Sequence, residues 1–436
     1  MHTPSSDALS ALLPAGTSSR IPLVVFSHLR WGFVFQRPQH LLTRLARQFD
    51  VFFVEEPVFA EGVPRLQSVR QAEGVEVLTP FTPVAAPGFH DDQMPALKAL
   101  VADFLAARLL TEPLAWLYTP MALPLVEDLD ARALVYDCMD ELAAFKFAPP
   151  QLLERERVLL EAADIVLTGG PSLYETRKHL HPNIHCLPSA VDAAHFSPHG
   201  LDRIRPESRL ADDLHRSLPH PRLGFFGVID ERLDLALVER LADLRPDWQI
   251  VMAGPVVKID PVTLPKRANL HWIGMQRYET LPYLLACWDV CLLPFALNEH
   301  TRFISPTKTL EYLAGGKPAV STPIRDVVSL YASAVSIGES AEDFARAVDR
   351  ILARSEDERA QWRIAARALV DGCTWDGTVA RIAALLQPYV GATSAGPIVL
   401  EEPLHDRAPL IVPRKDAAMP LPAAVQPEHG AQPLVS

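Results

Sequence analysis

The segment 294–323 carries the residues whose types and spacing best suit chemistry. Ser305 and Pro306 predict a helix start, because serine is favoured at the N-cap and proline at the first helical position. Lys308 would then lie in the first helical turn, where the helix dipole already places positive charge. With Arg302 just upstream, free helix amides and two cations would converge on one point. This arrangement favours a bound dianion such as a pyrophosphate.

Glu311 follows Lys308 by three residues and would lie one turn deeper on the same helix face. A carboxylate there is suited to accept hydrogen bonds from sugar hydroxyls. The alternative is a solvated helix start with an ordinary surface ion pair between Lys308 and Glu311.

The string SPTKTLEYLAGGKPAVST (305–322) resembles the donor-site signature of retaining, nucleotide-sugar-dependent glycosyltransferases of the two-domain GT-B type. The closest likeness is to the "group 1" transferases of bacterial polysaccharide and exopolysaccharide synthesis. The resemblance spans about 21–390, where WGFVFQRPQHLLTRLA, YDCMDEL, ADIVLTGGPSLYE and GVIDERLD fit the order of the family. It implies hexosyl transfer from a nucleoside-diphosphate sugar, with Lys308 on the pyrophosphate, Glu311 on the ribose, and neither metal nor cofactor.

One position departs from the family. The usual signature has two glutamates separated by seven residues, and Phe303 stands where the first would fall. That glutamate contacts the transferred sugar in the family, so Asn298, Glu299 or Thr301 are the expected substitutes. Stereochemical retention is an expectation only.

The resemblance also implies a wider donor site built from loops that follow strands. Gly227 would end a strand before a phosphate-contacting Arg232, Gly254 would close the next strand, and Met275 belongs to a segment expected to read the base. The predicted donor-binding residues are Gly227, Arg232, Gly254, Met275, Asn298, Thr301, Arg302, Ser305, Thr307, Lys308 and Glu311.

A basic and aromatic stretch predicts the acceptor site. Residues 20–49 contain five arginines and no Asp or Glu. Aromatic rings can stack on sugars and arginines can pair with phosphate, so we expect an acceptor site, for example for a phosphate-linked lipid carrier at an inner membrane leaflet. Its predicted residues are His28, Arg30, Trp31 and Arg37, joined by Asp140. Arg44 and Arg47 fit the solvated face of a helix equally well.

Asp137 and Asp140 lie just past another predicted strand end. By resemblance, one of them contacts the reacting sugar, and Asp137 is the predicted substrate contact or base, making Asp137, Lys308 and Glu311 the catalytic set. Helix capping by Asp140 is the alternative. Two carboxylates three residues apart can also bind a metal, although this architecture seldom requires one because cations and helix dipoles stabilise the leaving diphosphate.

The elements that position these residues follow an alternating pattern. Short apolar runs such as 22–27, 51–54 and 115–118 are separated by helical segments, and the pattern restarts at 223–228. This alternation predicts an α/β protein with two Rossmann-like, doubly wound parallel sheets facing a cleft. The loops after the carboxyl ends of the strands would form the site.

Composition sets the domain boundaries. We expect a flexible leader (1–20), an acceptor-side domain (21–191) and an aperiodic linker (192–220). A nucleotide-sugar-binding domain (221–374), a helix returning to the first domain (375–391) and a disordered proline-rich tail (392–436) follow.

Charge and targeting signals exclude other classes. The net charge of −12 disfavours nucleic acid as a partner. Five scattered cysteines form no CxxC pair, and no secretory signal or spanning segment is evident. We therefore expect a cytoplasmic protein, with peripheral membrane contact if the acceptor is lipid-linked. A sugar-nucleotide epimerase and a catalytically silent nucleotide-sugar-binding relative stay open as alternatives, whereas the absence of GxGxxG after either first strand disfavours a dinucleotide-dependent oxidoreductase.

Overall fold

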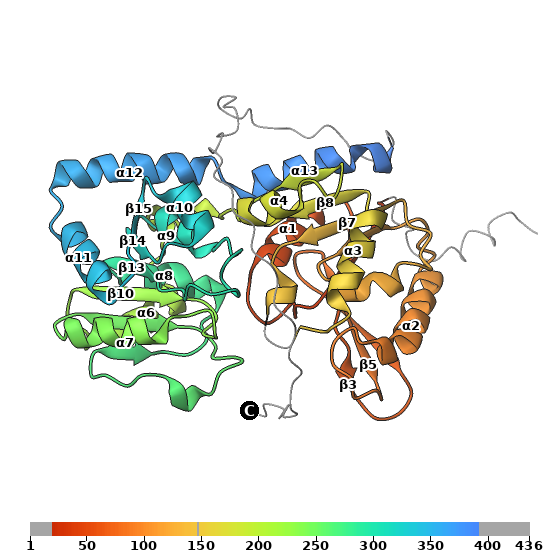
Figure 1. Cartoon of the computed structure of the whole chain (residues 1–436). Helices are drawn as coiled ribbons and strands as arrows, with labels where there is room; N and C mark the ends of the chain where they lie inside the picture. Colours follow the sequence, from red (N-terminus) through yellow and green to blue (C-terminus); the bar gives the residue numbers. More distant parts are fainter. Residues whose placement is uncertain (1–19, 146–147, 392–436) are drawn as a thin grey trace, which may run out of the picture.

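The structure, a computed structural model, describes residues 20–145 and 148–391. The predicted leader lies outside these residues except for Arg20, and the predicted tail 392–436 lies outside them entirely. Two α/β domains stand side by side (Figure 1). The prediction of two parallel-sheet domains is confirmed, with all strand pairs of both sheets parallel except one edge pair.

The first domain is built on a nine-stranded sheet in the order β3-β5-β2-β1-β6-β7-β8-β9, with β4 paired to β5, within the described residues. The strands are β1 (Pro22–Ser27), β2 (Asp50–Glu55), β3 (Val58–Phe59), β4 (Arg65–Arg70), β5 (Glu76–Thr82), β6 (Leu114–Leu117), β7 (Ala133–Cys138), β8 (Ile165–Thr168) and β9 (Ile184–Cys186). The helices are α1 (Arg37–Leu45), α2 (Met94–Ala107), α3 (Leu152–Ala162) and α4 (Pro171–Arg177). The pattern predicted neither β3 nor β4.

Both faces of this sheet are buried, as the unbroken apolar runs indicate. Val24 and Phe26 of β1 pack into one apolar cluster, while Leu23 and Val25 pack into another on the opposite face. Successive strand residues point to opposite faces, so one continuous apolar run serves two cores. Polar residues are therefore few in the strands and lie near the strand ends, as Glu55 of β2 and Asp137 of β7 do.

The second domain repeats this plan with the strand order β12-β11-β10-β13-β14-β15. The strands are β10 (Arg222–Phe226), β11 (Gln249–Ala253), β12 (Leu270–Trp272), β13 (Val290–Leu293), β14 (Ala319–Ser321) and β15 (Val335–Ile337). The helices are α7 (Leu235–Leu244), α8 (Leu281–Ala286), α9 (Lys308–Ala314), α10 (Arg325–Tyr331), α11 (Ala341–Leu352) and α12 (Glu356–Asp371).

The segment 192–220 is not the aperiodic linker that its composition predicts. It contains α5 (Ala193–Phe196) and α6 (Pro206–His215), and Phe196 and Ala211 are buried in the core of the second domain. The polar residues that hide the helical period lie on the exposed side of α6, which is why the pattern was missed.

The chain returns to the first domain after α12. Helix α13 (Trp375–Val390) buries Trp375 and Ile382 in the first domain's core, beside α1. Figure 1 shows α12 along the second domain and α13 along the first. The return of the C-terminal helix is as predicted. The chain passes between the two domains twice, near residue 191 and near residue 373. These two segments are joined by a hydrogen bond from the Val191 amide to the Cys373 carbonyl at 3.0 Å.

Candidate functional site

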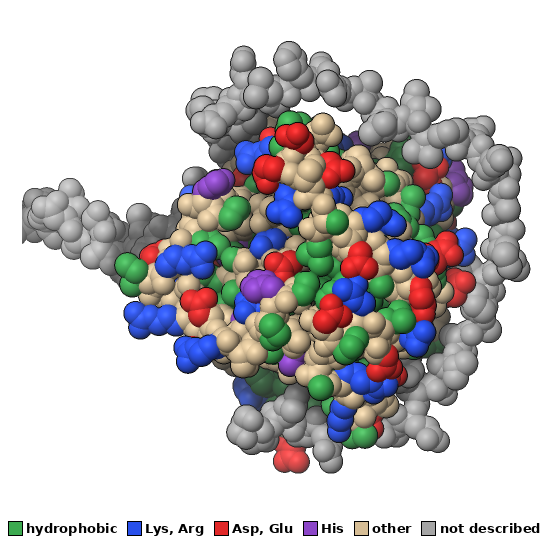
Figure 2. Space-filling model, turned by 90° about the vertical axis from the view of Figure 1, so that its left-hand side faces the viewer, with side chains coloured by type: hydrophobic (Ala, Val, Ile, Leu, Met, Phe, Trp, Pro, Cys, Tyr) green, Lys and Arg blue, Asp and Glu red, His purple; other side chains and the backbone are tan. Residues whose placement is uncertain are grey.

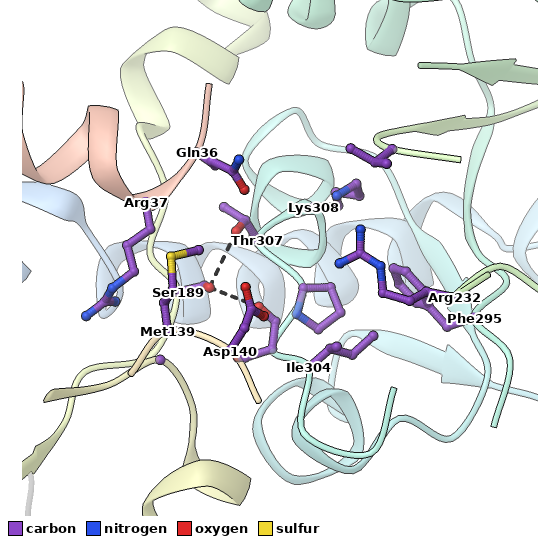
Figure 3. A pocket seen from close by; sticks show the side chains of 14 residues that line it. Gln36, Arg37, Met139, Asp140, Ser189, Arg232, Phe295, Ile304, Thr307 and Lys308 are labelled. Atoms are coloured by element: carbon purple, nitrogen blue, oxygen red, sulfur yellow. Dashed lines mark hydrogen bonds between the residues drawn. The ribbon is translucent and has the colours of Figure 1, made fainter. Parts of the chain in front are cut away.

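A pocket of about 100 Å³ lies between the two domains. Figure 3 shows Arg232 and Lys308 near each other on one side of it, with Asp140 and Ser189 nearer the first domain. Its lining comprises Gln36, Arg37, Met139, Asp140, Gly169 and Ser189 of the first domain, and Val228, Arg232, Phe295, Ile304, Ser305, Pro306, Thr307 and Lys308 of the second.

Strand ends position this lining. Met139 and Asp140 follow β7, Gly169 follows β8, and Val228 follows β10. The carboxyl ends of parallel strands meet at one edge of a sheet, where open α/β sheets place their ligands. Both sheets therefore direct this edge toward the same cleft.

Helix α9 begins at Lys308, with Thr307 as its N-cap, so the predicted start at Ser305 is corrected. The residues before it form a turn in which the Thr309 amide donates to the Pro306 carbonyl at 3.1 Å. This turn is tied to the first domain, because the Ser189 hydroxyl donates to the Ser305 carbonyl at 2.9 Å. The Thr307 hydroxyl also donates to Ser189 Oγ at 3.4 Å.

Lys308 packs over Gly227, which in turn packs against Gly254. A Cβ on Gly227 would lie 1.9 Å from Lys308 Cε, and a Cβ on Gly254 would lie 1.7 Å from the Gly227 carbonyl oxygen. Both glycines have positive φ, of 145° and 153°. Gly227 therefore makes room for the lysine side chain, and Gly254 makes room for the backbone of Gly227. Burial lowers the pKa of Lys308, partly offset by Glu311, and its ammonium forms no hydrogen bond or ion pair with any described residue.

The second cation of the pocket is held in place. The Arg232 guanidinium binds the buried Asp230 carboxylate through Nε at 3.0 Å and Nη2 at 2.7 Å. It also lies over the Phe145 ring of the first domain at 5.7 Å. Arg232 is thus a fixed positive charge that bridges the domains, whereas Lys308 is a free one.

Glu311 lies one turn below Lys308 and is 6% exposed. Burial raises the pKa of its carboxyl to about 7, against the attraction of Lys308. No hydrogen bond or ion pair to this carboxylate is formed within the described part of the chain. Glu311 does not line the pocket, so it can reach only a ligand that extends beyond it.

Asp140 presents an unpaired carboxylate to the pocket. Burial raises its pKa to about 6, and the nearby cations Arg232, Arg37 and Lys308 limit that rise. Among the described residues its carboxylate has no hydrogen-bond or ion-pair partner, and it caps no helix, so the capping alternative is excluded. Asp140 can therefore accept a hydrogen bond or a proton from a ligand.

Asp137, the predicted base, is corrected by the structure. Its side chain is completely buried, and Arg37 donates to both carboxylate oxygens through Nε at 3.1 and 3.0 Å. Arg37 also donates to the Leu187 carbonyl at 2.8 Å, and Figure 3 shows its guanidinium pointing away from Lys308. Alternation along β7 turns Asp137 inward and leaves Asp140, in the following loop, to face the pocket. Asp137 is a positioning residue for Arg37.

The predicted acceptor cation Arg30 is likewise engaged within its own domain. It donates to Glu55 Oε2 at 3.2 Å and to the Glu56 carbonyl at 2.6 Å. The Trp31 amide donates to Glu55 Oε1 at 2.7 Å, and its ring packs edge-on against Phe53. These contacts fold the loop against β2, so neither residue lines the pocket.

His28 also lies off the pocket lining. Burial and the neighbouring Lys258 lower its pKa to about 4, so its imidazole is neutral at pH 7. Its Nδ1 is buried without a hydrogen-bond partner.

Residues 298–303 of the loop before α9 lie outside the pocket lining, in contrast to residues 304–307. Phe303 packs against an apolar cluster of the first domain, and His300 Nδ1 hydrogen-bonds the Ala144 carbonyl. The Thr301 amide donates to Asn298 Oδ1 at 3.2 Å, which folds the loop. Arg302 is exposed beside Glu299 at 3.8 Å.

Of the eleven predicted donor residues, Arg232, Ser305, Thr307 and Lys308 line the pocket. The other seven lie outside its lining: Gly227, Gly254, Met275, Asn298, Thr301, Arg302 and Glu311.

Sequence reasoning missed several lining residues. Gln36 is the N-cap of α1, Ser189 follows β9, and Met139 lies between the two aspartates. Ser189 and Gln36 could have been found as polar residues just past a strand end and at a helix start. Met139 and Ile304 carry no signal of their own.

No group of three or more His, Cys, Asp or Glu side chains in residues 20–145 and 148–391 is arranged to hold a metal ion. No helix of that part of the chain is long and apolar enough to span a bilayer.

Comparison with known proteins identifies a family domain in the second half of the chain. Residues 220–354 match the family model of glycosyl transferases group 1. The chain is 26% identical over 256 residues to a putative teichuronic acid biosynthesis glycosyltransferase, TuaH, of Bacillus subtilis (strain 168). That match covers 55% of this chain and 64% of the relative, so the chain spans under two thirds of the relative's length.

Solved structures show the same two-domain fold. Sucrose-phosphate synthase from Thermosynechococcus elongatus has a TM-score of 0.62 at 15% identity, covering 84% of this chain and 98% of its own. Anabaena HepE, solved with UDP and glucose, has a TM-score of 0.62 at 14% identity, covering 84% of this chain and 99% of its own.

The two-domain fold is that of the GT-B class. Within it, residues 220–354 form a domain that matches glycosyl transferases group 1. The resemblance seen in the sequence is thereby confirmed, and neither the epimerase nor the silent relative is favoured.

Proposed function

We propose that this protein transfers a hexose from a nucleoside-diphosphate sugar to a glycan or lipid-linked acceptor, with its own side chains and no metal or cofactor. The observation that carries the proposal is a cluster of three shielded, ionisable side chains without partners among the described residues. Lys308, Glu311 and Asp140 each lack a hydrogen bond or ion pair there. Buried charges are normally paired, so these three groups are available to bind a polar ligand.

The donor diphosphate is assigned to Lys308 and Arg232. Two cations within a partly enclosed pocket match a dianionic group, and they stabilise the negative charge that develops as the diphosphate leaves. The hydroxyls of Ser305 and Thr307 lie beside it; Ser305 Oγ is buried without a partner. Glu311, deeper in the second domain, would accept hydrogen bonds from the nucleoside sugar.

Asp140 is assigned to the reacting sugar or the acceptor. In the transfer, the bond between the anomeric carbon and the diphosphate oxygen breaks, and its electron pair leaves with the diphosphate. The acceptor oxygen bonds to the anomeric carbon, and its proton passes to a base. With a pKa near 6, Asp140 is ionised at pH 7.5 and can orient the acceptor hydroxyl or take that proton.

An acceptor on a lipid carrier would place the protein at the inner membrane leaflet. The arginine-rich stretch 20–49 no longer supports that contact, because Arg30 and Arg37 are occupied within the first domain and Arg44 binds Asp192 and Asp376. The lipid-linked acceptor therefore rests on the resemblance to polysaccharide-synthesising transferases alone.

A transfer assay tests the proposal. The purified protein is incubated with a panel of UDP-, GDP- and dTDP-hexoses and with acceptors from a polysaccharide-producing membrane extract. We expect one donor to release its nucleoside diphosphate only when acceptor is present, with a mass increment of one hexose on the acceptor. Donor binding without turnover under all conditions would contradict transfer, and interconversion of the sugar nucleotide without acceptor would indicate an epimerase.

A further inference from the structure

A second depression, of about 280 Å³, lies on the second domain away from the cleft. It is bounded by the segment before β13, the turn between α9 and β14, and the junction of α11 with α12. Its lining is Trp288, Asp289, Gly316, Lys317, Pro318, Ile351, Leu352, Arg354, Arg359, Trp362 and Arg363.

This depression is distinct from the candidate active site. Trp288 and Asp289 precede β13, whereas Phe295 of the inter-domain pocket follows the same strand. At roughly 3.3 Å per strand residue, the two ends lie about 20 Å apart. The two sites therefore occupy opposite edges of one sheet and share no lining residue.

The lining has an excess of positive charge. Its four cationic side chains are Lys317, Arg354, Arg359 and Arg363, against the single carboxylate of Asp289. That carboxylate already accepts from His220 and from the Arg222 amide, both at 2.7 Å. In a chain of net charge −12, this is a local reversal of sign.

Three of the four cations have structural partners. Lys317 donates to the Ala286 and Trp288 carbonyls at 3.1 and 2.6 Å, and Arg359 donates to two carbonyls at the end of α11. Arg363 pairs with Glu356 at 2.5 Å.

Arg354 differs, because it forms no hydrogen bond or ion pair with any described residue. Burial lowers its pKa. The nearby Glu358 carboxylate accepts hydrogen bonds from Ser355 and forms no ion pair with Arg354, so this half-buried guanidinium is available to an anionic ligand.

Aromatic and aliphatic side chains line the depression beside Arg354. Trp362 fixes its indole by donating to the Ala334 carbonyl at 2.8 Å, and Arg354 lies over its ring at 5.9 Å. Ile351 and Leu352 add apolar surface. Over the end of the molecule shown in Figure 2, cationic and acidic side chains are interspersed.

We propose that this depression is a second binding site, for a saccharide that carries a carboxylate or phosphate group. Arg354 would bind the anionic group, and the apolar face of the sugar ring would lie against Trp362. Such a ligand is either a free sugar phosphate or a residue of an acidic glycan chain. This site goes beyond the transferase activity and does not depend on it, because binding there needs no residue of the cleft.

Isothermal titration calorimetry of the full chain tests the site with glucose 6-phosphate, an acidic tetrasaccharide of galacturonate, neutral maltotetraose and inorganic phosphate. We expect one of the two anionic saccharides to bind and maltotetraose not to bind, in the presence of saturating UDP as in its absence. Preference for glucose 6-phosphate identifies a sugar phosphate as the ligand, and preference for the tetrasaccharide identifies a glycan.

Matched variants locate the binding. Arg354→Gln is expected to weaken binding about tenfold or more, since one charge-assisted contact is worth roughly that factor. Arg367→Gln removes the same charge from an exposed pair with Asp371 on the same helix and should leave binding unchanged. Trp362→Leu should also weaken saccharide binding. Arg354→Gln should keep the wild-type melting temperature, which would show that its weaker binding does not come from unfolding. The proposal is overturned if neither anionic saccharide binds, if Arg354→Gln binds as well as wild type, or if inorganic phosphate binds equally well.

Discussion

The two positively charged regions that border the cleft differ in what their cations contact. In the first domain, Arg30 and Arg37 are bound by carboxylates and carbonyls of their own domain. In the second domain, Lys308 contacts neither a carboxylate nor a carbonyl of the described chain, although its pKa is lowered by burial. The sequence has more cationic residues in the first region, but the cation that is free to bind a ligand, Lys308, lies in the second.

The same contrast separates two carboxylates only three residues apart. Asp137 is buried and bound by Arg37, whereas Asp140 is unpaired and faces the pocket. A charged group without a partner is costly to keep, so the unpaired groups are the ones expected to act on a ligand. The number of charged residues in the sequence therefore indicates a charged region, but the absence of partners in the structure indicates which of those residues can bind a ligand.

Removing the free cation should have the largest effect. Lys308→Ala is expected to lower kcat/KM for the donor by about 100- to 1000-fold, the usual loss when one group stabilising developing charge is deleted. Arg302→Ala is the matched control, because this exposed neighbour pairs only weakly with Glu299, and its loss should change kcat/KM less than about threefold. Steady-state kinetics with the identified donor measures both. Equal losses in the two variants would remove the distinction between free and engaged cations.

Displacing the same lysine without removing it should have the next largest effect. Gly227→Ala places a methyl group 1.9 Å from Lys308 Cε at a φ of 145°, so the ammonium must move. We expect about a 10- to 100-fold loss in kcat/KM, since small displacements of a positioned group are costly. Gly32→Ala, where the added Cβ meets nothing within 4 Å, should retain wild-type kinetics. Wild-type donor kinetics for Gly227→Ala would refute the packing argument.

Asp140→Asn should give an intermediate loss of about 10- to 100-fold in kcat, with a changed pH profile. In the wild type, kcat should rise with pH through about 6, because burial raises the pKa of Asp140 and only the ionised group accepts a proton. The variant should lose this acidic limb.

The raised pKa of Asp140 also makes the stability of the protein depend on pH. Between its unfolded pKa near 3.8 and its folded pKa near 6, the folded protein binds a proton that the unfolded chain does not. The stabilisation is complete below this window and lost as pH rises through it. Asp140→Asn should therefore raise the melting temperature at pH 7.5, and a lowered melting temperature would show that the carboxylate has a structural partner.

Asp137→Asn should act on folding instead. Removing one member of the buried Arg37 pair leaves an uncompensated charge, which lowers the free energy of unfolding by about 3 kcal/mol. Denaturant unfolding followed by circular dichroism measures this change. If Asp137→Asn were as stable as the wild type but inactive, Asp137 would instead have a catalytic role.

The smallest effect on kinetics is expected from Arg30→Ala. Its contacts with Glu55 and Glu56 stabilise a loop, so the melting temperature should fall while the acceptor KM stays within about twofold of wild type. Acceptor titrations at fixed donor measure this. A large rise in acceptor KM at an unchanged melting temperature would restore Arg30 as an acceptor contact.

Much of the fold could be predicted from the sequence because buried parallel strands are continuous apolar runs. β1, for example, was predicted over 22–27, the bounds it has. Helices α5 and α6 were missed because exposed polar residues obscure their short apolar stripe, and β4 because five of its six residues are exposed. The expectation that the site forms at the carboxyl ends of the strands agrees with the pocket lining. The predicted site residues found there are Arg37, Asp140, Arg232, Ser305, Thr307 and Lys308. It could not show that Asp137 would turn inward to Arg37, since that ion pair joins residues 100 positions apart.

We infer that Lys308 is the free cation that binds a nucleoside diphosphate. Calorimetric titration of wild-type protein and Lys308→Ala with UDP, GDP and dTDP tests it most directly. We predict that one nucleoside diphosphate binds the wild type and that the variant binds it about 100-fold more weakly. If no nucleoside diphosphate binds the wild type, or if Lys308→Ala binds as tightly, the claim is contradicted.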